Sequence, residues 1–306
     1  MSRHVAVLMG GWSSERDISL VSGRGCAAAL TSLGYDAYTV DVTRDLGALL
    51  AALTPRPDVV FNALHGTGGE DGTIQGVLEF LKIPYTHSGV LASAAGMHKP
   101  TAKAVFAAAR LPLAEDKVVS RQALAAGDVM ARPFVVKPIA EGSSVGVRIV
   151  RENDNSWATE VRQWAYEEAL VEAFIPGREL TVAVMGERAL GALEIRPNNA
   201  TMYDYHAKYA PGGSTHLMPA PIHPRAYDEA LDIGLRAHRA LGCRGVSRSD
   251  LRYDDTHGEP GRVILLEINT QPGMTPTSLV PDIAKHVGIG FAELVRWMVE
   301  NAACDS

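Results

Sequence analysis

The chain has 306 residues, of which 46% are apolar, and this is enough for two or three domains with ordinary globular cores. Its net charge of −6, without a long basic run, argues against a nucleic-acid surface, although a few lysines or arginines can still bind phosphate. No apolar run approaches the roughly 18 residues of a membrane span. Cys26, Cys243 and Cys304 match neither a zinc spacing nor a disulfide framework, so we expect a cytoplasmic protein with reduced thiols.

Strand and helix signals alternate over the first ninety residues. Strands are expected at residues 5–9, 36–42, 58–64 and 83–85, and helices at residues 18–33, 46–53 and 72–81. This rhythm predicts a parallel sheet with helices on both faces. Right-handed crossovers place the carboxyl ends of the strands along one edge, where ligands bind. Two polar, glycine-containing loops at residues 10–17 and 65–72 follow the first and third strands, so both are expected on this edge.

The rest of the chain predicts two further units with more strands. Strands are expected at residues 134–137, 147–150, 169–175, 179–185, 190–196, 245–253 and 262–269, and helices at residues 100–109, 157–166, 225–241 and 290–302. The polar stretch 197–224 is longer than an ordinary connection and predicts a lid. Disorder is the alternative, but three tyrosines within seven residues argue against it. We expect domains at residues 1–95, 96–176 and 177–306.

The end of the strand at residues 262–269 carries a carboxylate and an amide. Glu267 and Asn269 are two residues apart, so their side chains point to the same face, and oxygen ligands side by side suit a hard cation such as Mg²⁺. Arg248 and Asp250 repeat this spacing upstream. Arg248 could stabilise an oxyanion or a phosphate, and an ion pair with Asp250 is the plainer alternative.

Two lysines and two glutamates are further candidates for binding a nucleotide without a Walker A motif. Lys137 ends an apolar strand and needs an anionic partner, either a phosphate or a structural carboxylate. Lys99 opposes the dipole at a helix start, which hints at a nearby anion, although a solvated lysine is commoner. Glu172 and Glu179 flank a turn and are either exposed hinge acids or partners of a base and a ribose.

Six blocks of sequence, taken together, resemble the D-alanine–D-alanine ligase family of the ATP-grasp superfamily over nearly the whole chain. The blocks are residues 10–19, 64–76, 137–146, 203–209, 248–250 and 267–275. The resemblance implies an α/β and α+β protein, with an N-terminal Rossmann-like parallel-sheet domain followed by a two-subdomain ATP-grasp fold. It also implies ATP-dependent joining of two D-alanine molecules through an acyl phosphate, for peptidoglycan synthesis.

The resemblance also implies roles for individual residues. The nucleotide residues are Lys99 and Lys137 for the phosphates of ATP, Glu172, Phe174 and Ile175 for adenine, and Glu179 for the ribose. The metal residues are Asp250, Glu267 and Asn269, for two Mg²⁺ or Mn²⁺. The catalytic residues are Glu15, Ser143 and Tyr209 as a triad around the first D-alanine, Arg248 at the oxyanion, and Lys208 on the transferred phosphoryl group. The remaining substrate residues are His65, the Gly273 amide, and Ser278 and Leu279 for the second carboxylate.

Tyr209 is expected to favour an amine acceptor over D-lactate, because depsipeptide-forming relatives are expected to carry histidine there. Ala173 and His206 depart from the family pattern, the first near adenine and the second in the lid. The resemblance implies a homodimer through the N-terminal domain, with no nucleic-acid or membrane partner. Another ATP-grasp ligase and a non-catalytic nucleotide-binding module are the alternatives. A dehydrogenase is disfavoured because residues 10–12 lack the Gly-x-Gly-x-x-Gly spacing.

Overall fold

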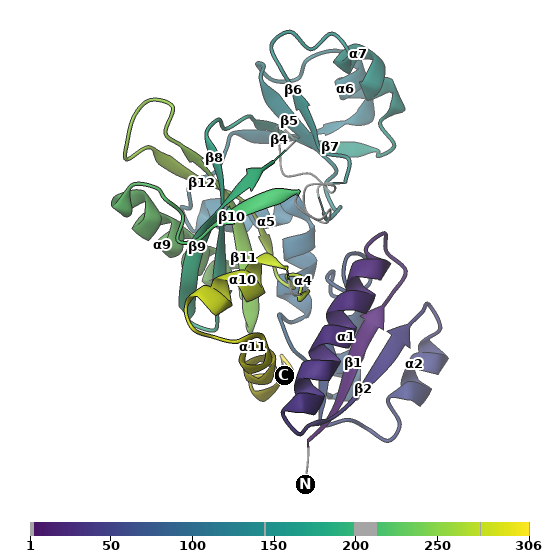
Figure 1. The fold of residues 1–306 in the computed structure, drawn as a ribbon. Helices are drawn as coiled ribbons and strands as arrows, with labels where there is room; N and C mark the ends of the chain where they lie inside the picture. The colour runs from purple at the N-terminus through teal and green to yellow at the C-terminus, as the bar shows by residue number, and fades with distance from the viewer. Residues whose placement is uncertain (1–2, 144, 199–212, 276, 306) are drawn as a thin grey trace.

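The computed structural model describes residues 3–143, 145–198, 213–275 and 277–305, and these contain three β-sheets. Figure 1 shows a four-stranded sheet at the top, a three-stranded sheet at the lower right and a five-stranded sheet to their left. The strand orders are β2-β1-β3, β4-β7-β5-β6 and β10-β9-β8-β11-β12. The predicted α/β and α+β fold with a parallel N-terminal sheet is therefore confirmed, and the two later sheets are antiparallel.

The N-terminal sheet is parallel and covered on both faces. Its strands are β1 (His4–Gly10), β2 (Asp36–Val42) and β3 (Val59–Asn62), and its helices are α1 (Arg16–Ser32), α2 (Leu46–Ala52) and α3 (Thr73–Leu81). Val5 and Val7 of β1 pack into a core that includes α1, whereas Ala6 and Leu8 pack into another that includes α2 and α3. A strand with both faces buried reads as a continuous apolar run, which is why β1 was recognisable.

The expected fourth strand at residues 83–85 is reduced to isolated bridges. Tyr85 pairs in parallel with Val60 and antiparallel with Ala303, so the C-terminal tail runs beside the N-terminal sheet. The helix α11 (Phe291–Glu300), which precedes this tail, packs against α1.

Two helices connect the N-terminal sheet to the rest of the molecule. α4 (Val90–Met97) was not expected, because its alanines, serine and glycine form no apolar stripe. α5 (Lys99–Ala108) begins one residue before its expected start, and the His98 ring accepts a hydrogen bond from the Thr101 amide to cap it. Both helices contact β12, so α5 carries Lys99 to the edge of the five-stranded sheet.

The four-stranded sheet is antiparallel. Its elements are β4 (Asp116–Ser120), β5 (Phe134–Lys137), β6 (Arg148–Val150), β7 (Glu168–Ala173), α6 (Arg121–Ala126), α7 (Trp157–Glu160) and η1 (Val161–Gln163). Neither β4 nor α6 was expected. The strand β4 is a largely exposed edge strand without apolar alternation. The single helix expected at residues 157–166 is instead two short turns that place Trp157 and Trp164 in the core.

The five-stranded sheet lies between helices on both faces. Its strands are β8 (Arg178–Met185), β9 (Arg188–Pro197), β10 (Ser214–Leu217), β11 (Val246–Asp254) and β12 (Arg262–Asn269). α9 (Pro224–Leu241) packs on one face, and α10 (Leu279–His286) and α11 pack with the other. α10 was not expected. β10 lies inside the stretch predicted as a lid, so residues 214–217 are sheet rather than loop.

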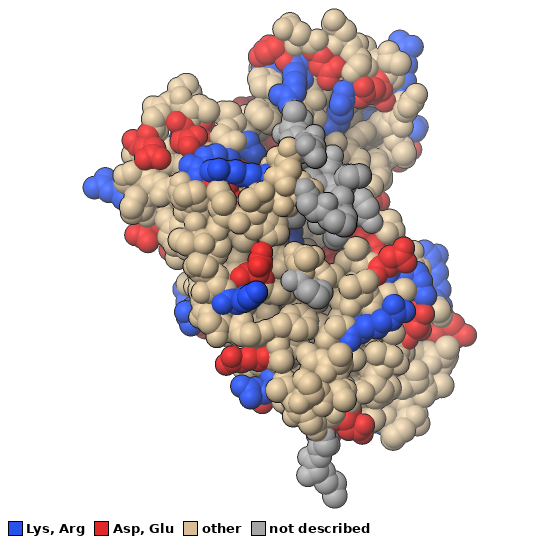
Figure 2. All heavy atoms as spheres, viewed as in Figure 1, with Lys and Arg blue, Asp and Glu red and all other residues tan. Residues whose placement is uncertain are grey.

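Two further observations concern the charged surface and the helices. On the face drawn in Figure 2, the described lysines and arginines are interspersed with acidic residues rather than gathered into a basic patch. Within the described part of the chain, no helix has both the length and the apolar character needed to cross a bilayer.

Candidate active site

A first pocket, here called the nucleotide pocket, lies between the four-stranded and five-stranded sheets. Its lining includes eight of the predicted site residues: Lys99, Lys137, Glu172, Phe174, Ile175, Glu179, Asp250 and Glu267. They come from the start of α5, from β5, β7 and the turn after it, and from the facing strands β8, β11 and β12. All six residues predicted for the nucleotide and two of the three predicted for metal therefore lie around one cavity.

Cations and carboxylates meet at the base of the nucleotide pocket. Lys137 and Glu172 lie on paired antiparallel strands and form an ion pair of 2.5 Å, so a carboxylate is the partner of this lysine. Glu172 is only 2% exposed, so the alternative of an exposed hinge acid is wrong for it. Burial raises the pKa of Glu172, but Lys137 and Lys103 outweigh this and leave it below the usual value. Lys103, a buried residue of α5, was not predicted.

The other end of the nucleotide pocket is apolar and is flanked by an arginine that sequence reasoning missed. The Arg252 guanidinium lies 5.9 Å from the centre of the Phe174 ring and donates to the carbonyls of Ile175 (3.1 Å) and Gly177 (2.7 Å). Its Nη1 is 3.7 Å from Glu179. Burial lowers the pKa of Arg252. This arginine stabilises the turn that carries Phe174 and Ile175.

The ends of β11 and β12 place the predicted metal residues side by side. Asp250 is directly opposite Glu267 in the ladder, and Arg248 is opposite Asn269. Both guanidinium bonds of Arg248 to Asp250 are present, at 2.8 and 2.7 Å, so the ion pair considered as an alternative exists in this structure.

The donor set at these strand ends suits a hard cation that takes further ligands from a phosphate or from water. Asp250 also accepts a hydrogen bond of 2.8 Å from Thr181. Within the residues that the structure describes, no group of three His, Cys, Asp or Glu side chains is arranged to hold a metal. Two carboxylates and the Asn269 amide, without a full protein cage, fit Mg²⁺ bound together with substrate phosphates.

A second pocket, here called the substrate pocket, adjoins the first at the ends of β11 and β12. Its lining includes the predicted residues Glu15, His65, Ser143, Arg248, Asn269, Gly273, Ser278 and Leu279. They come from loops beside the sheets, from the strands β11 and β12 and from the start of α10, and these segments are far apart in the sequence. Asn269 lines this pocket, whereas Asp250 and Glu267 line the nucleotide pocket, so the metal residues stand at the junction of the two.

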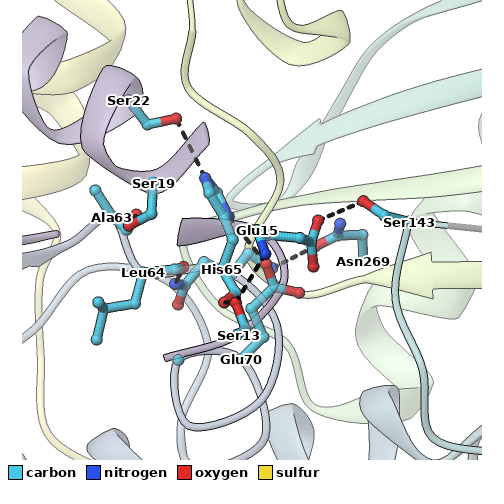
Figure 3. A network of polar contacts seen from close by, with 12 residues as sticks. Ser13, Glu15, Ser19, Ser22, Ala63, Leu64, His65, Glu70, Ser143 and Asn269 are labelled. Atoms are coloured by element: carbon cyan, nitrogen blue, oxygen red, sulfur yellow. Dashed lines mark hydrogen bonds and ion pairs between the residues drawn. The ribbon is translucent and has the colours of Figure 1, made fainter. Parts of the chain in front are cut away.

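Glu15 and Ser143 point toward each other across the substrate pocket (Figure 3). The Ser143 hydroxyl donates a hydrogen bond to Glu15, which is only 8% exposed and precedes α1. Ser143 lies in the loop between β5 and β6 with φ of 51°, a left-handed conformation, and its side chain lines the pocket. The predicted partner Tyr209 lies outside the described residues, as does Lys208.

His65 is held by a carboxylate that was not predicted. Its Nδ1 lies 2.9 Å from Glu70, and its Nε2 lies 3.2 Å from the Ser22 hydroxyl (Figure 3). Burial raises the pKa of Glu70, and the hydrogen bond with His65 partly offsets this. Glu70 lies in the loop at residues 65–72, which was expected on the ligand-binding edge of the N-terminal sheet, so its role could have been predicted from that position.

The opposite side of the substrate pocket is the N-terminus of α10. Ser278 is the residue before the helix, and its Oγ accepts from the Thr275 amide at 3.0 Å and lies 2.8 Å from the Thr275 hydroxyl. These contacts connect Thr275 to the residue that precedes the helix. Backbone amides and the dipole at a helix N-terminus attract a carboxylate, which suits the role predicted for Ser278 and Leu279.

Comparison with known proteins bears on the whole chain. Residues 104–300 match the model of the D-ala D-ala ligase C-terminus, and residues 47–88 match that of the N-terminus. The D-alanine–D-alanine ligase of Paramagnetospirillum magneticum is 60% identical over 309 residues (100% of both chains), and that of Granulibacter bethesdensis is 57% identical over 303 residues (99% of this chain, 98% of the relative).

Solved structures agree with this. The D-alanine–D-alanine ligase of Bacillus anthracis complexed with ATP superposes with a TM-score of 0.79 at 27% identity, covering 98% of this chain and 97% of that one. A second structure of the same enzyme gives a TM-score of 0.80 at 29% identity, with the same coverage. With both family models matched and the relatives aligned almost end to end, the chain belongs to the D-alanine–D-alanine ligase family.

Proposed function

We propose that the protein joins two molecules of D-alanine to D-alanyl-D-alanine at the expense of ATP, as a step of peptidoglycan synthesis. The observation that carries this proposal is the junction of the two pockets. The ladder pair Asp250 and Glu267 lines the nucleotide pocket, while the ladder pair Arg248 and Asn269, two residues further along the same strands, lines the substrate pocket. The terminal phosphate of a nucleotide in the first pocket would therefore lie next to the carboxylate of a substrate in the second pocket.

The nucleotide pocket supplies charge neutralisation for phosphoryl transfer. Lys99 and Lys137 would bind the phosphates of ATP, because phosphoryl transfer depends on positioning and electrostatic stabilisation more than on covalent help. Asp250, Glu267 and Asn269 would hold two Mg²⁺ or Mn²⁺, whose chemistry is to neutralise the charge on the transferred group. Phe174 and Ile175 would contact adenine, with Glu172 accepting from its amine and Glu179 from the ribose.

The reaction has two steps that balance without another reactant. A carboxylate oxygen of the first D-alanine forms a bond to the γ-phosphorus as the bond to ADP breaks, giving an acyl phosphate. The amine of the second D-alanine then attacks the acyl carbon and loses a proton. The tetrahedral intermediate collapses, and the bond to inorganic phosphate breaks as the peptide bond is completed.

Residues of the substrate pocket orient these steps. Glu15, held by Ser143, would bind the ammonium of the first D-alanine, and His65 would contact substrate beside it. The Arg248 guanidinium and the Gly273 amide would stabilise the oxyanion of the tetrahedral intermediate. Ser278 and Leu279 would bind the carboxylate of the second D-alanine at the N-terminus of α10.

Four parts of the proposal rest on the family resemblance. They are Lys208 on the transferred phosphoryl group, Tyr209 in the triad with Glu15, a homodimer through the N-terminal domain and a cytoplasmic location. A lid over the pockets would keep water from the acyl phosphate, which hydrolyses readily.

The experiment that tests the function is ADP release with D-alanine or L-alanine as the only amino acid, followed by mass analysis of the product. We expect ADP, phosphate and dipeptide in equal amounts with D-alanine, and only background ADP with L-alanine. Another carboxylate–amine ligase would release ADP with a different acid or amine and leave D-alanine unused, and that result would overturn the proposal.

A further inference from the structure

Lys103 is a buried lysine that no proposed step of the reaction uses. It lies on α5 one turn after Lys99, so both side chains leave the same face of the helix. Its ammonium is 2.6 Å from Oε1 of Glu172, 3.4 Å from Oδ1 of Asp116 and 3.4 Å from the Ala114 carbonyl. Lys103 is 4% exposed and is not part of the lining of the nucleotide pocket.

Glu172 is therefore shared between two lysines with different surroundings. Its Oε1 faces Lys103, and its Oε2 faces Lys137 at 2.5 Å. Lys137 lines the nucleotide pocket together with Glu172, and the more distant carboxylates Glu267 and Glu179 also act on it. One cation of the pair thus faces the space where a phosphate would bind, and the other is enclosed behind it.

This arrangement would keep the charge of Glu172 paired when a nucleotide binds. If Lys137 turns from Glu172 to a phosphate, it leaves a carboxylate that is 2% exposed. A buried carboxylate that loses its only cation is strongly destabilised, because neither water nor a counter-charge replaces the lost partner. With Lys103 remaining at 2.6 Å, Glu172 keeps a cationic partner while Lys137 moves, and it is nearer to that cation than Asp116 at 3.4 Å.

We propose that Lys103 is a positioning residue: it compensates Glu172 so that Lys137 can exchange from that carboxylate to a phosphate of the bound nucleotide. This inference rests on the proposed function, because it requires an adenine nucleotide in the pocket. It adds a role for a residue outside the pocket lining. Lys103 contributes to affinity only for ligands that recruit Lys137.

The inference distinguishes ligands with phosphates from those without them. ADP engages Lys137 and requires the exchange, whereas adenosine fills the apolar end and leaves Lys137 on Glu172. Removing the Lys103 charge is therefore expected to weaken ADP and to spare adenosine. General damage to the pocket would weaken both ligands alike.

The experiment measures dissociation constants of ADP and adenosine by calorimetry, with Mg²⁺ present throughout, for wild type, Lys103→Met and Lys103→Arg. We expect Lys103→Met to weaken ADP about tenfold or more while adenosine changes less than about threefold. Lys103→Arg, which keeps the charge, is expected to restore most of the ADP affinity. Equal losses for the two ligands, or unchanged ADP affinity, would overturn the inference.

A second pair of variants keeps the test decisive if Lys103→Met does not fold. Glu172→Gln removes the carboxylate that needs compensation, so adding Lys103→Met to it is expected to change ADP affinity less than about threefold. A further loss of tenfold or more would show that Lys103 acts other than through Glu172. If wild-type protein binds no ADP, the proposed function itself fails. If wild type binds ADP and Lys103→Met binds it equally well, only the inference fails.

Discussion

Replacing Arg248 by methionine removes a guanidinium that lines the substrate pocket and binds Asp250 through two hydrogen bonds of 2.8 and 2.7 Å. Loss of one oxyanion donor typically costs about 3 kcal/mol, or on the order of a hundredfold in kcat. Asp250 keeps its hydrogen bond to Thr181 at 2.8 Å, so we expect the protein to fold and to bind ATP. The assay is steady-state ADP release at saturating ATP and D-alanine, with thermal unfolding as the check on folding.

Arg252 provides a matched control on the same strand. It is also a partly buried arginine of β11, but it faces the Phe174 end of the nucleotide pocket. We expect Arg252→Met to raise the KM for ATP several-fold, about 2- to 10-fold, with kcat within about threefold of wild type. If Arg248→Met keeps kcat within about threefold of wild type, or if both variants lose kcat equally, the oxyanion role of Arg248 is wrong.

Glu15→Gln keeps the shape of a side chain that is 8% exposed but removes its charge. We expect the KM for the first D-alanine to rise about 10-fold or more, while the KM for ATP stays nearly unchanged. An unchanged KM for D-alanine would contradict the proposed binding of its ammonium group by Glu15. Burial lowers the pKa of His238 to about 4, below its usual value of 6.5, so the folded state resists a proton that the unfolded state binds. The stabilisation from neutral His238 is therefore complete above pH 6.5 and lost as the pH falls toward 4. Between pH 7.5 and 5 the free energy of unfolding should fall by about 2 kcal/mol more in wild type than in His238→Gln, and parallel denaturation curves would refute this. Gly177 has φ of +88°, and an added Cβ would lie 2.1 Å from the Tyr253 carbonyl oxygen, whereas Gly242 has φ of +74° and open space. We expect Gly177→Ala to cost at least about 2 kcal/mol of stability and Gly242→Ala only about 1 kcal/mol; equal costs in urea unfolding would show that the close contact relaxes.

The apolar pattern of the sequence predicted helices and strands correctly where their buried residues recur at a regular spacing. The residues of β1 are apolar because helices cover both faces of its sheet. The helix α9 has an apolar stripe because one side of the helix packs on the five-stranded sheet. β4 and α4 escaped prediction for the opposite reason. The first is an exposed edge strand, and the second is built from small residues, so neither has a periodic apolar face.

The chemistry of the candidate site followed from short motifs, because residues two apart on one strand must share a face. Glu267 and Asn269 could be paired in this way from the sequence alone, as could Arg248 and Asp250. The register of β11 against β12 could not be predicted, because the connection at residues 255–261 is longer than a tight two-residue turn and the register shifts between Asp250 and Leu251.

Only the tertiary structure decided which charges meet. Ser143 is 128 residues from Glu15, and Glu172 is 69 residues from Lys103, so no local pattern links them. Burial then decides which of these contacts matter, because a carboxylate removed from water needs a cation whereas an exposed one does not. The sequence therefore determined the types of chemical group and their local faces. The packing of three sheets around two adjoining pockets determined their partners.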